Sequence, residues 1–109
     1  MTTLDTIRIK NGATFDRLYS IEYEQDEGTF VGWTGLCEVY DCNGKIIQQL
    51  DFSWIVDGHS FRLTSQTPID WPVTYNGSAL EYDVRWRLGD VYSPSQTGFI
   101  EVDKQVTRL

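Results

Sequence analysis

The sequence is poor in cysteine, proline and histidine, and it has no long apolar run. Its 109 residues include two cysteines, three prolines and one histidine. Cys37 and Cys42 are too few for a disulfide scaffold, so we expect free thiols, with a short-loop disulfide between them as the alternative. No apolar stretch approaches the roughly 20 residues of a membrane helix. The start, Met1–Ile7, lacks the basic and apolar regions of a signal peptide, so we expect a cytosolic protein or one assembled there.

Basic residues are also scarce relative to acidic ones. Nine Lys and Arg side chains stand against sixteen Asp and Glu, a formal net charge of −7. A nucleic-acid backbone or an anionic membrane requires clustered positive charge, so we expect neither as a partner. The 40% of apolar residues is enough for a packed core.

Alternation of apolar and polar residues with a period of two dominates the chain. It is cleanest at Leu80–Leu88, where the even positions are apolar and the odd ones charged. A second run, Ile46–Trp54, has an apolar face of Ile46, Leu50, Phe52 and Trp54. No window of useful length has the helical period, so we expect strands and no substantial helix.

Turn-forming pairs separate these runs at regular intervals. Asn43-Gly44 predicts a hairpin between Leu36–Asp41 and Lys45–Trp54, and Gly89-Asp90 predicts another between Ala79–Leu88 and Val91–Ser93. Seven or eight short strands with such turns predict an antiparallel two-sheet β-sandwich, with a small closed barrel as the alternative. We expect one domain over residues 1–109, whose ends at 1–5 and 103–109 are flexible or bound to a partner.

Signals for catalysis and metal binding are weak. Cys37, Cys42 and His59 match no common zinc spacing, and His59 follows a turn with no nucleophile motif nearby. Acidic residues could in principle act in pairs, but each fits a solvated strand face or turn equally well. These candidates are Asp51, Asp57, Glu81 and Asp83. We therefore expect a non-enzymatic protein without catalytic residues, metal or cofactor.

The chain is rich in aromatic residues, with four tryptophans and six tyrosines. Trp54 and Trp86 lie on apolar strand faces and are expected in the core. Trp33 and Trp71 lie in or beside turns, where core and interface roles are equally open. With Tyr75, they are the candidate anchors of a protein–protein contact.

Several short motifs of turn and core residues are spread over nearly the whole chain: Ile7–Phe15, Trp33–Val39, Tyr40–Ile46, Trp71-Pro72 followed by Leu80–Trp86, and Gly98–Thr107. In this order they resemble an immunoglobulin-like domain associated with bacteriophage tails and baseplates, similar to the N-terminal domain of phage upper baseplate proteins. One departure is Ala13, which stands where the family usually has an acidic residue.

The resemblance implies an immunoglobulin-like sandwich and a structural role in a virion. On this hypothesis the chain is an assembly or adaptor module of the tail, baseplate or fibre-attachment region. Its partners would be other phage structural proteins and further copies of itself, in a ring or trimer. The alternatives are a capsid decoration or head-stabilising protein and a carbohydrate-binding module for host recognition.

Overall fold

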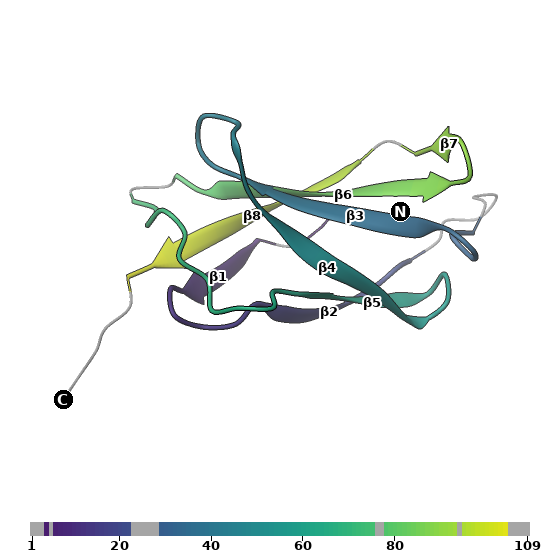
Figure 1. Ribbon diagram of the computed structural model, residues 1–109, viewed down its shortest axis with the longest axis horizontal. Helices are drawn as coiled ribbons and strands as arrows, with labels where there is room; N and C mark the ends of the chain where they lie inside the picture. The colour runs from purple at the N-terminus through teal and green to yellow at the C-terminus, as the bar shows by residue number, and fades with distance from the viewer. Residues whose placement is uncertain (1–3, 5, 23–28, 76–77, 94, 105–109) are drawn as a thin grey trace.

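The computed structural model describes residues 4, 6–22, 29–75, 78–93 and 95–104, and these form eight strands without a helix (Figure 1). The strands are β1 (Ile7–Lys10), β2 (Asp16–Ser20), β3 (Thr34–Tyr40), β4 (Ile46–Val56), β5 (Ser60–Thr64), β6 (Leu80–Leu88), β7 (Val91–Tyr92) and β8 (Gln96–Asp103). They pair along one path, β1-β8-β6-β3-β4-β5-β2, and β7 pairs with β6.

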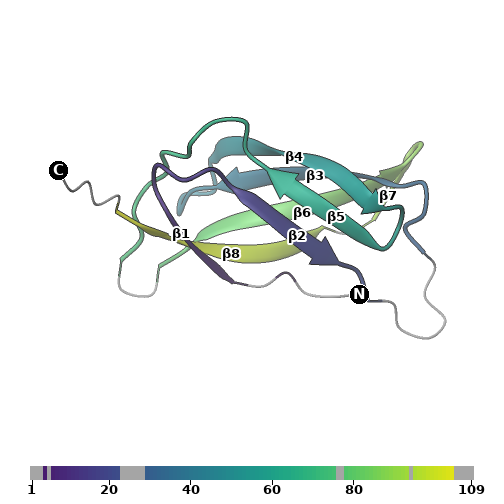
Figure 2. The same cartoon turned by 90° about the horizontal axis from the view of Figure 1, so that it is seen from below.

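Strand β4 divides this path into two layers (Figure 2). Its first half, up to Leu50, pairs with β3, whereas its second half, from Asp51 onward, pairs with β5. The first layer is therefore β1-β8-β6-β3 with the start of β4, and the second is the end of β4 with β5 and β2. Because β1 and β2 end an open path in the described part of the chain, the fold is a sandwich and not a closed barrel.

The order of strands within the layers is that of an immunoglobulin-like sandwich. In that fold the second, fifth and fourth strands share one sheet, and the third, sixth and seventh share the other. Here β2, β5 and β4 form one layer and β3, β6 and β8 the other, with the two-residue β7 as an addition. The predicted fold class is confirmed.

One pairing differs from the antiparallel expectation. β1 runs parallel to β8, with Ile7 beside Ile100 and Lys10 beside Asp103. The chain then crosses to β2 in the opposite layer. Alternation along a strand shows which side chains are buried but not which neighbour the strand takes, so this parallel pair was not readable from the sequence.

Both predicted hairpins are present. β3 and β4 flank the turn at Gly44, which has a φ of 79°, and β6 and β7 flank the turn at Gly89, with a φ of 57°. Asn-Gly and Gly-Asp supply residues that tolerate positive φ, which explains why these turns form at these places.

The core is built around Trp86, which is fully buried on β6. The Trp54 ring of β4 stacks on it with centroids 5.5 Å apart, and Phe61 of β5 meets it edge-on at 5.3 Å. Trp86 thus joins the first layer to the second and has the core position predicted for it, and Trp54 is partly buried against the core.

Two residues of the predicted apolar faces are exposed instead. Ile46 is 49% exposed because Tyr40 pairs with Ile46 and Val39 with Gln48, leaving Ile47 as an extra residue that reverses the alternation. Leu88 is 43% exposed because it ends β6 beyond the last buried residue of that strand, Trp86.

The loop before β3 rests on the turn between β4 and β5. A Cβ placed on Gly58 would lie 2.7 Å from the Val31 backbone nitrogen, and the Asp57 carboxylate accepts a hydrogen bond of 3.1 Å from the Gly32 amide. Gly58 also has a φ of 73°, so both its conformation and its surroundings require glycine.

We expect Gly58→Ala to lower the free energy of unfolding clearly more than Gly44→Ala does. Both glycines have positive φ, which by itself costs an alanine on the order of 1 kcal/mol. A Cβ on Gly44 meets nothing within 4 Å, whereas one on Gly58 meets backbone atoms. Denaturant unfolding of both variants measures the difference, and equal losses would contradict the close packing at Gly58.

Candidate interaction surfaces

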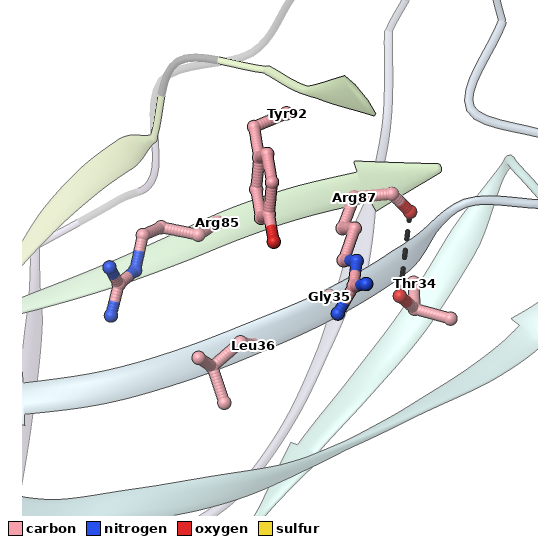
Figure 3. A pocket seen from close by; sticks show the side chains of 6 residues that line it. All are labelled: Thr34, Gly35, Leu36, Arg85, Arg87 and Tyr92. Carbon is pink, nitrogen blue, oxygen red and sulfur yellow. Dashed lines mark hydrogen bonds between the residues drawn. The ribbon is translucent and has the colours of Figure 1, made fainter. Parts of the chain in front are cut away.

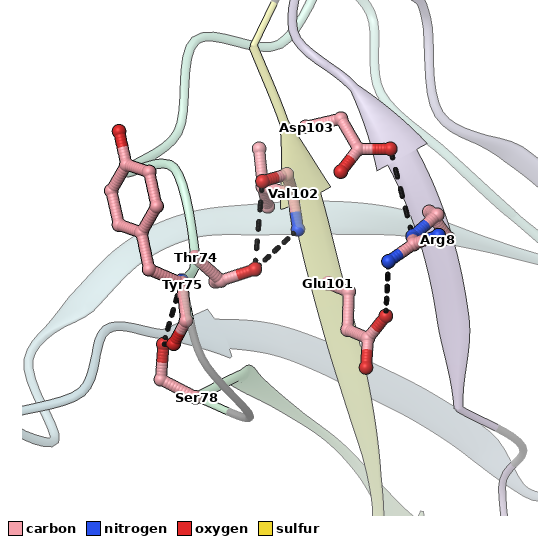
Figure 4. Close-up of polar contacts among 7 residues, drawn as sticks. All are labelled: Arg8, Thr74, Tyr75, Ser78, Glu101, Val102 and Asp103. Atoms are coloured by element: carbon pink, nitrogen blue, oxygen red, sulfur yellow. Dashed lines mark hydrogen bonds and ion pairs between the residues drawn. The ribbon is translucent and has the colours of Figure 1, made fainter.

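The three predicted anchors do not form one site. Trp33 precedes β3 at the end of the sandwich where β6 meets β7, since Thr34 pairs with Arg87. Tyr75 lies at the opposite end, next to a Thr74 side chain that exchanges hydrogen bonds with the Val102 backbone (Figure 4). A single contact through all three predicted anchors is therefore not available.

Trp71 is a core residue, which corrects its interpretation as a surface anchor. Only 4% of it is exposed, and its indole nitrogen donates a 2.8 Å hydrogen bond to the Gln48 side chain. The Asn11 side chain holds the Trp71 backbone at both its nitrogen and its carbonyl, at 2.9 and 2.8 Å. The two prolines Pro68 and Pro72 predict an extended segment outside the sheets. The Trp71 side chain of this segment nevertheless packs into one end of the core.

Trp33 is half-buried, and Tyr75 is exposed. The Trp33 ring packs edge-on against Phe30 with centroids 5.3 Å apart, and its carbonyl accepts a 2.7 Å hydrogen bond from the Trp54 indole. Tyr75 is 70% exposed, and its backbone is held by Ser78. Of the three predicted anchors, Tyr75 alone presents most of its side chain to a partner.

The ends of the chain lie partly outside the described residues, which include neither 1–3 and 5 nor 105–109. Leu4 is buried and joins the core, close to Gly98. Asp103 belongs to β8, and its carboxylate forms an ion pair of 3.6 Å with Arg8 of β1. The Arg8 guanidinium also forms an ion pair of 3.3 Å with Glu101 (Figure 4). These described residues are held by the domain itself.

The outer face of the first layer, which is directed away from the core, carries its side chains in regular rows. Cross-strand partners fall into four successive rows: Phe99, Glu81, Tyr40 and Ile46; then Thr97, Asp83, Glu38 and Gln49; then Arg85 and Leu36; and finally Tyr92, Arg87 and Thr34. Along β6 the charges on this outer face are therefore acidic at one end and basic at the other.

A cleft of about 450 Å³ lies at the basic end of the outer face (Figure 3). It is lined by Thr34, Gly35, Leu36, Arg85, Arg87 and Tyr92. The Arg87 guanidinium lies 5.5 Å from the centre of the Tyr92 ring, a cation–π distance. Arg85 forms an ion pair with the mostly buried Glu38. The cleft thus combines positive charge with an exposed aromatic ring.

A second surface lies at one end of the sandwich, where exposed aliphatic side chains come from the ends of β4, β6 and β7 and from the loop before β3. We call it the loop-end surface, and it consists of Val31, Ile55, Val56, Leu88 and Val91. Each is between 43% and 58% exposed. The sequence contains a signal for this surface, because four of these residues flank the turns Asp57-Gly58 and Gly89-Asp90, outside the strand interiors.

The residues considered for catalysis lie in separate places. His59 is in the turn between β4 and β5, whereas Glu81 and Asp83 lie on β6 in the other layer. The Asp83 carboxylate accepts a 2.6 Å hydrogen bond from the Thr97 hydroxyl, and the Asp57 carboxylate accepts one from the Gly32 amide. Within the described ranges no three His, Cys, Asp or Glu side chains form a group that could hold a metal ion. In the same ranges, no helix has the length and apolarity to cross a membrane.

Both cysteines are free thiols, in different environments. Cys37 is fully buried in β3, and Cys42 is exposed in the turn that follows. Burial, with a smaller contribution from Asp83, raises the pKa of Cys37 to about 12. Burial also raises the pKa of Tyr82, whose hydroxyl accepts a hydrogen bond of 3.2 Å from the Tyr19 hydroxyl across the two layers.

The comparisons with known proteins do not extend the fold class that the strand order defines. No protein-family model matches the chain, and no curated protein matches it. Among solved structures, the crystal structure of DIP-gamma IG1+IG2 aligns with a TM-score of 0.47 and 10% sequence identity, over 95% of this chain and 47% of that one. This chain thus spans about half of that chain, and the class defined here, an immunoglobulin-like β-sandwich, rests on the strand order described above.

We expect a thiol reagent at pH 8 to modify Cys42 quickly and Cys37 only on unfolding. The Cys37 thiol is buried, and its raised pKa keeps it protonated at this pH. Absorbance of a released aromatic thiolate counts the equivalents, first in buffer and then in denaturant. The variant Cys42→Ser should lose the fast equivalent, and two fast equivalents in the wild-type protein would contradict the burial of Cys37.

We also expect stability to fall as the pH rises from about 9 towards 12. The Cys37 thiol has its ordinary pKa of 9.0 in the unfolded chain, whereas its pKa in the folded chain is about 12. Below pH 9 both states are protonated and the full stability is present. Chemical unfolding at several pH values measures the slope, which Cys37→Ala should make shallower. An unchanged slope in that variant would contradict a raised pKa at Cys37.

Proposed function

We propose that this chain is a non-enzymatic structural protein of a tailed bacteriophage virion. It acts as an assembly or adaptor module in the tail, baseplate or fibre-attachment region, and it works through protein–protein contacts. Its partners are other phage structural proteins and further copies of the same chain, and it is assembled into the particle in the host cytoplasm.

The observation that carries the contact role is the loop-end surface. Large contiguous patches of exposed aliphatic side chains are uncommon on small monomeric domains. Where such a patch occurs, it often marks an interaction site. Val31 lies in the loop before β3, and Leu88 at the end of β6 pairs with Val91 at the start of β7. A Cβ on Gly32, next to Val31, would lie 3.9 Å from Leu88. The Asp57 carboxylate accepts a hydrogen bond from the Gly32 amide, and Leu88 pairs with Val91, so these residues are positioned by the fold before a partner covers them.

The phage assignment is supported by the sequence motifs. The residues that carry the resemblance include those that build the fold, such as the Asn43-Gly44 turn and the buried face of Leu80–Trp86. These positions build an immunoglobulin-like sandwich, and the resemblance that they carry supports the proposal of a tail or baseplate context.

The tryptophans near the turns do not favour the carbohydrate-binding alternative. Sugar binding on aromatic platforms requires exposed rings, and among the described residues this alternative would depend on the exposed tyrosines Tyr75 and Tyr92. Trp71 is buried, and Trp33 is half-buried against Phe30. No feature of the described residues favours a capsid decoration protein over a tail module.

The test is incorporation into particles. In purified virions of the phage that encodes the chain, quantitative mass spectrometry should find a fixed number of copies per particle. We expect Val91→Asp to reduce that number by about tenfold, because a buried unpaired carboxylate in a contact costs several kcal/mol.

Leu18→Asp is the matched control, since Leu18 is 64% exposed on β2, away from the loop-end surface. Thermal unfolding should confirm that both variants are folded. Equal incorporation of the two variants would overturn the loop-end contact, and absence of the wild-type chain from the virions would overturn the phage assignment.

A further inference from the structure

The charges on the outer face of β6 are arranged so that the strand complements a reversed copy of itself. From one end to the other they are Glu81, Asp83, Arg85 and Arg87. Their side chains share one face, because residues two apart in a strand point the same way. A second β6 laid over the first in the opposite direction would bring Glu81 to Arg87 and Asp83 to Arg85, twice each.

We infer that the outer face is a dimer interface, on which two copies of this chain pack with β6 against β6. The two copies are related by a twofold axis that lies between the sheets and runs across the strands, at the level between Asp83 and Arg85. This inference extends the proposed homo-oligomeric contacts to one defined face and one symmetry.

The neighbouring strands fit the same symmetry. An axis across the strands keeps each strand opposite its own copy and reverses the order of the rows. Phe99, in the first row beside β6, then lies opposite Tyr92, in the last row on the same side of β6. Both are exposed aromatics, at 44% and 66%, so each end of the contact gains an aromatic pair.

In this dimer, a tyrosine of each copy also fills the cleft at the basic end of the other copy. On β3 the reversed order places Tyr40 of one copy over Thr34 of the other, at the wall of the cleft that Thr34, Leu36 and Arg87 line. Tyr40 is half-buried on its own sheet, so the exposed part of its side chain is available to enter the cleft of the second copy. The cleft is of a size for an aromatic side chain, at about 450 Å³.

The alternative twofold axis, along the strands, is unfavourable. It would keep the rows in register and place the acidic rows of the two copies together, and likewise the basic rows. Glu81 has no ion-pair partner within the described part of its own chain, so its charge is available to a second copy. Like charges face to face would oppose association, and the net charge of −7 would add to the repulsion.

The test uses charge reversal at both ends of β6, with mass measured by light scattering and sedimentation. The wild-type chain should be a dimer at micromolar concentrations, since four strands give an interface at the small end of the stable range. Arg87→Glu and Glu81→Lys should each weaken the dimer at least about tenfold, because each change places like charges together twice.

Mixing the two variants in equal amounts should restore the dimer. Arg87→Glu carries an outer face that is acidic at both ends, and Glu81→Lys carries one that is basic at both ends. The heterodimer therefore has opposite charges at each contact, and native mass spectrometry distinguishes it from either homodimer.

Arg17→Glu and Asp70→Lys are matched controls for total charge, since both residues are exposed and lie outside the outer face. They should leave the wild-type mass unchanged. A monomeric wild-type chain, a dimer that tolerates Arg87→Glu, or a mixture that stays monomeric would overturn the inference. None of these results bears on Val91, which lies off this face, so virion incorporation still tests the proposed function separately.

Discussion

The contact of Trp86 with the opposite layer is the constraint on which the rest of the structure depends. Its ring lies between strands of both sheets, stacked on Trp54 and met edge-on by Phe52 and Phe61. Aromatic side chains of this size bury much apolar surface and prefer defined geometries, so they fix the spacing and the relative position of the layers. Without a disulfide between the sheets, this cluster and the Tyr19–Tyr82 hydroxyl pair provide the cross-links between them.

That inward packing determines what remains on the surface. β6 buries Leu80, Tyr82, Val84 and Trp86, and the intervening charged residues therefore all point outward. The order of the charges along the outer face is thus a direct consequence of register. The loop-end surface has a different origin: four of its aliphatic residues lie at strand ends beside the turns at Gly58 and Gly89, and the fifth, Val31, lies in the loop before β3.

The function proposed here depends on surfaces and not on a reactive group. The thiol of Cys37 is buried in the fold. The exposed features on which the proposals rest are the aliphatic cluster at one end and the charged face of the first layer. Both are suited to contacts with proteins, and they lie on different parts of the domain, so the same copy could use them together.

The sequence by itself determined the strands, the hairpins at Asn43-Gly44 and Gly89-Asp90, and the burial of Trp86, because alternation and turn chemistry are local properties of the chain. It did not reveal the parallel pairing of β1 with β8, the burial of Trp71, or the aliphatic cluster formed by strand ends and the loop before β3. Each of these depends on which segments become neighbours, and neighbours far apart in sequence are decided only when the two layers pack.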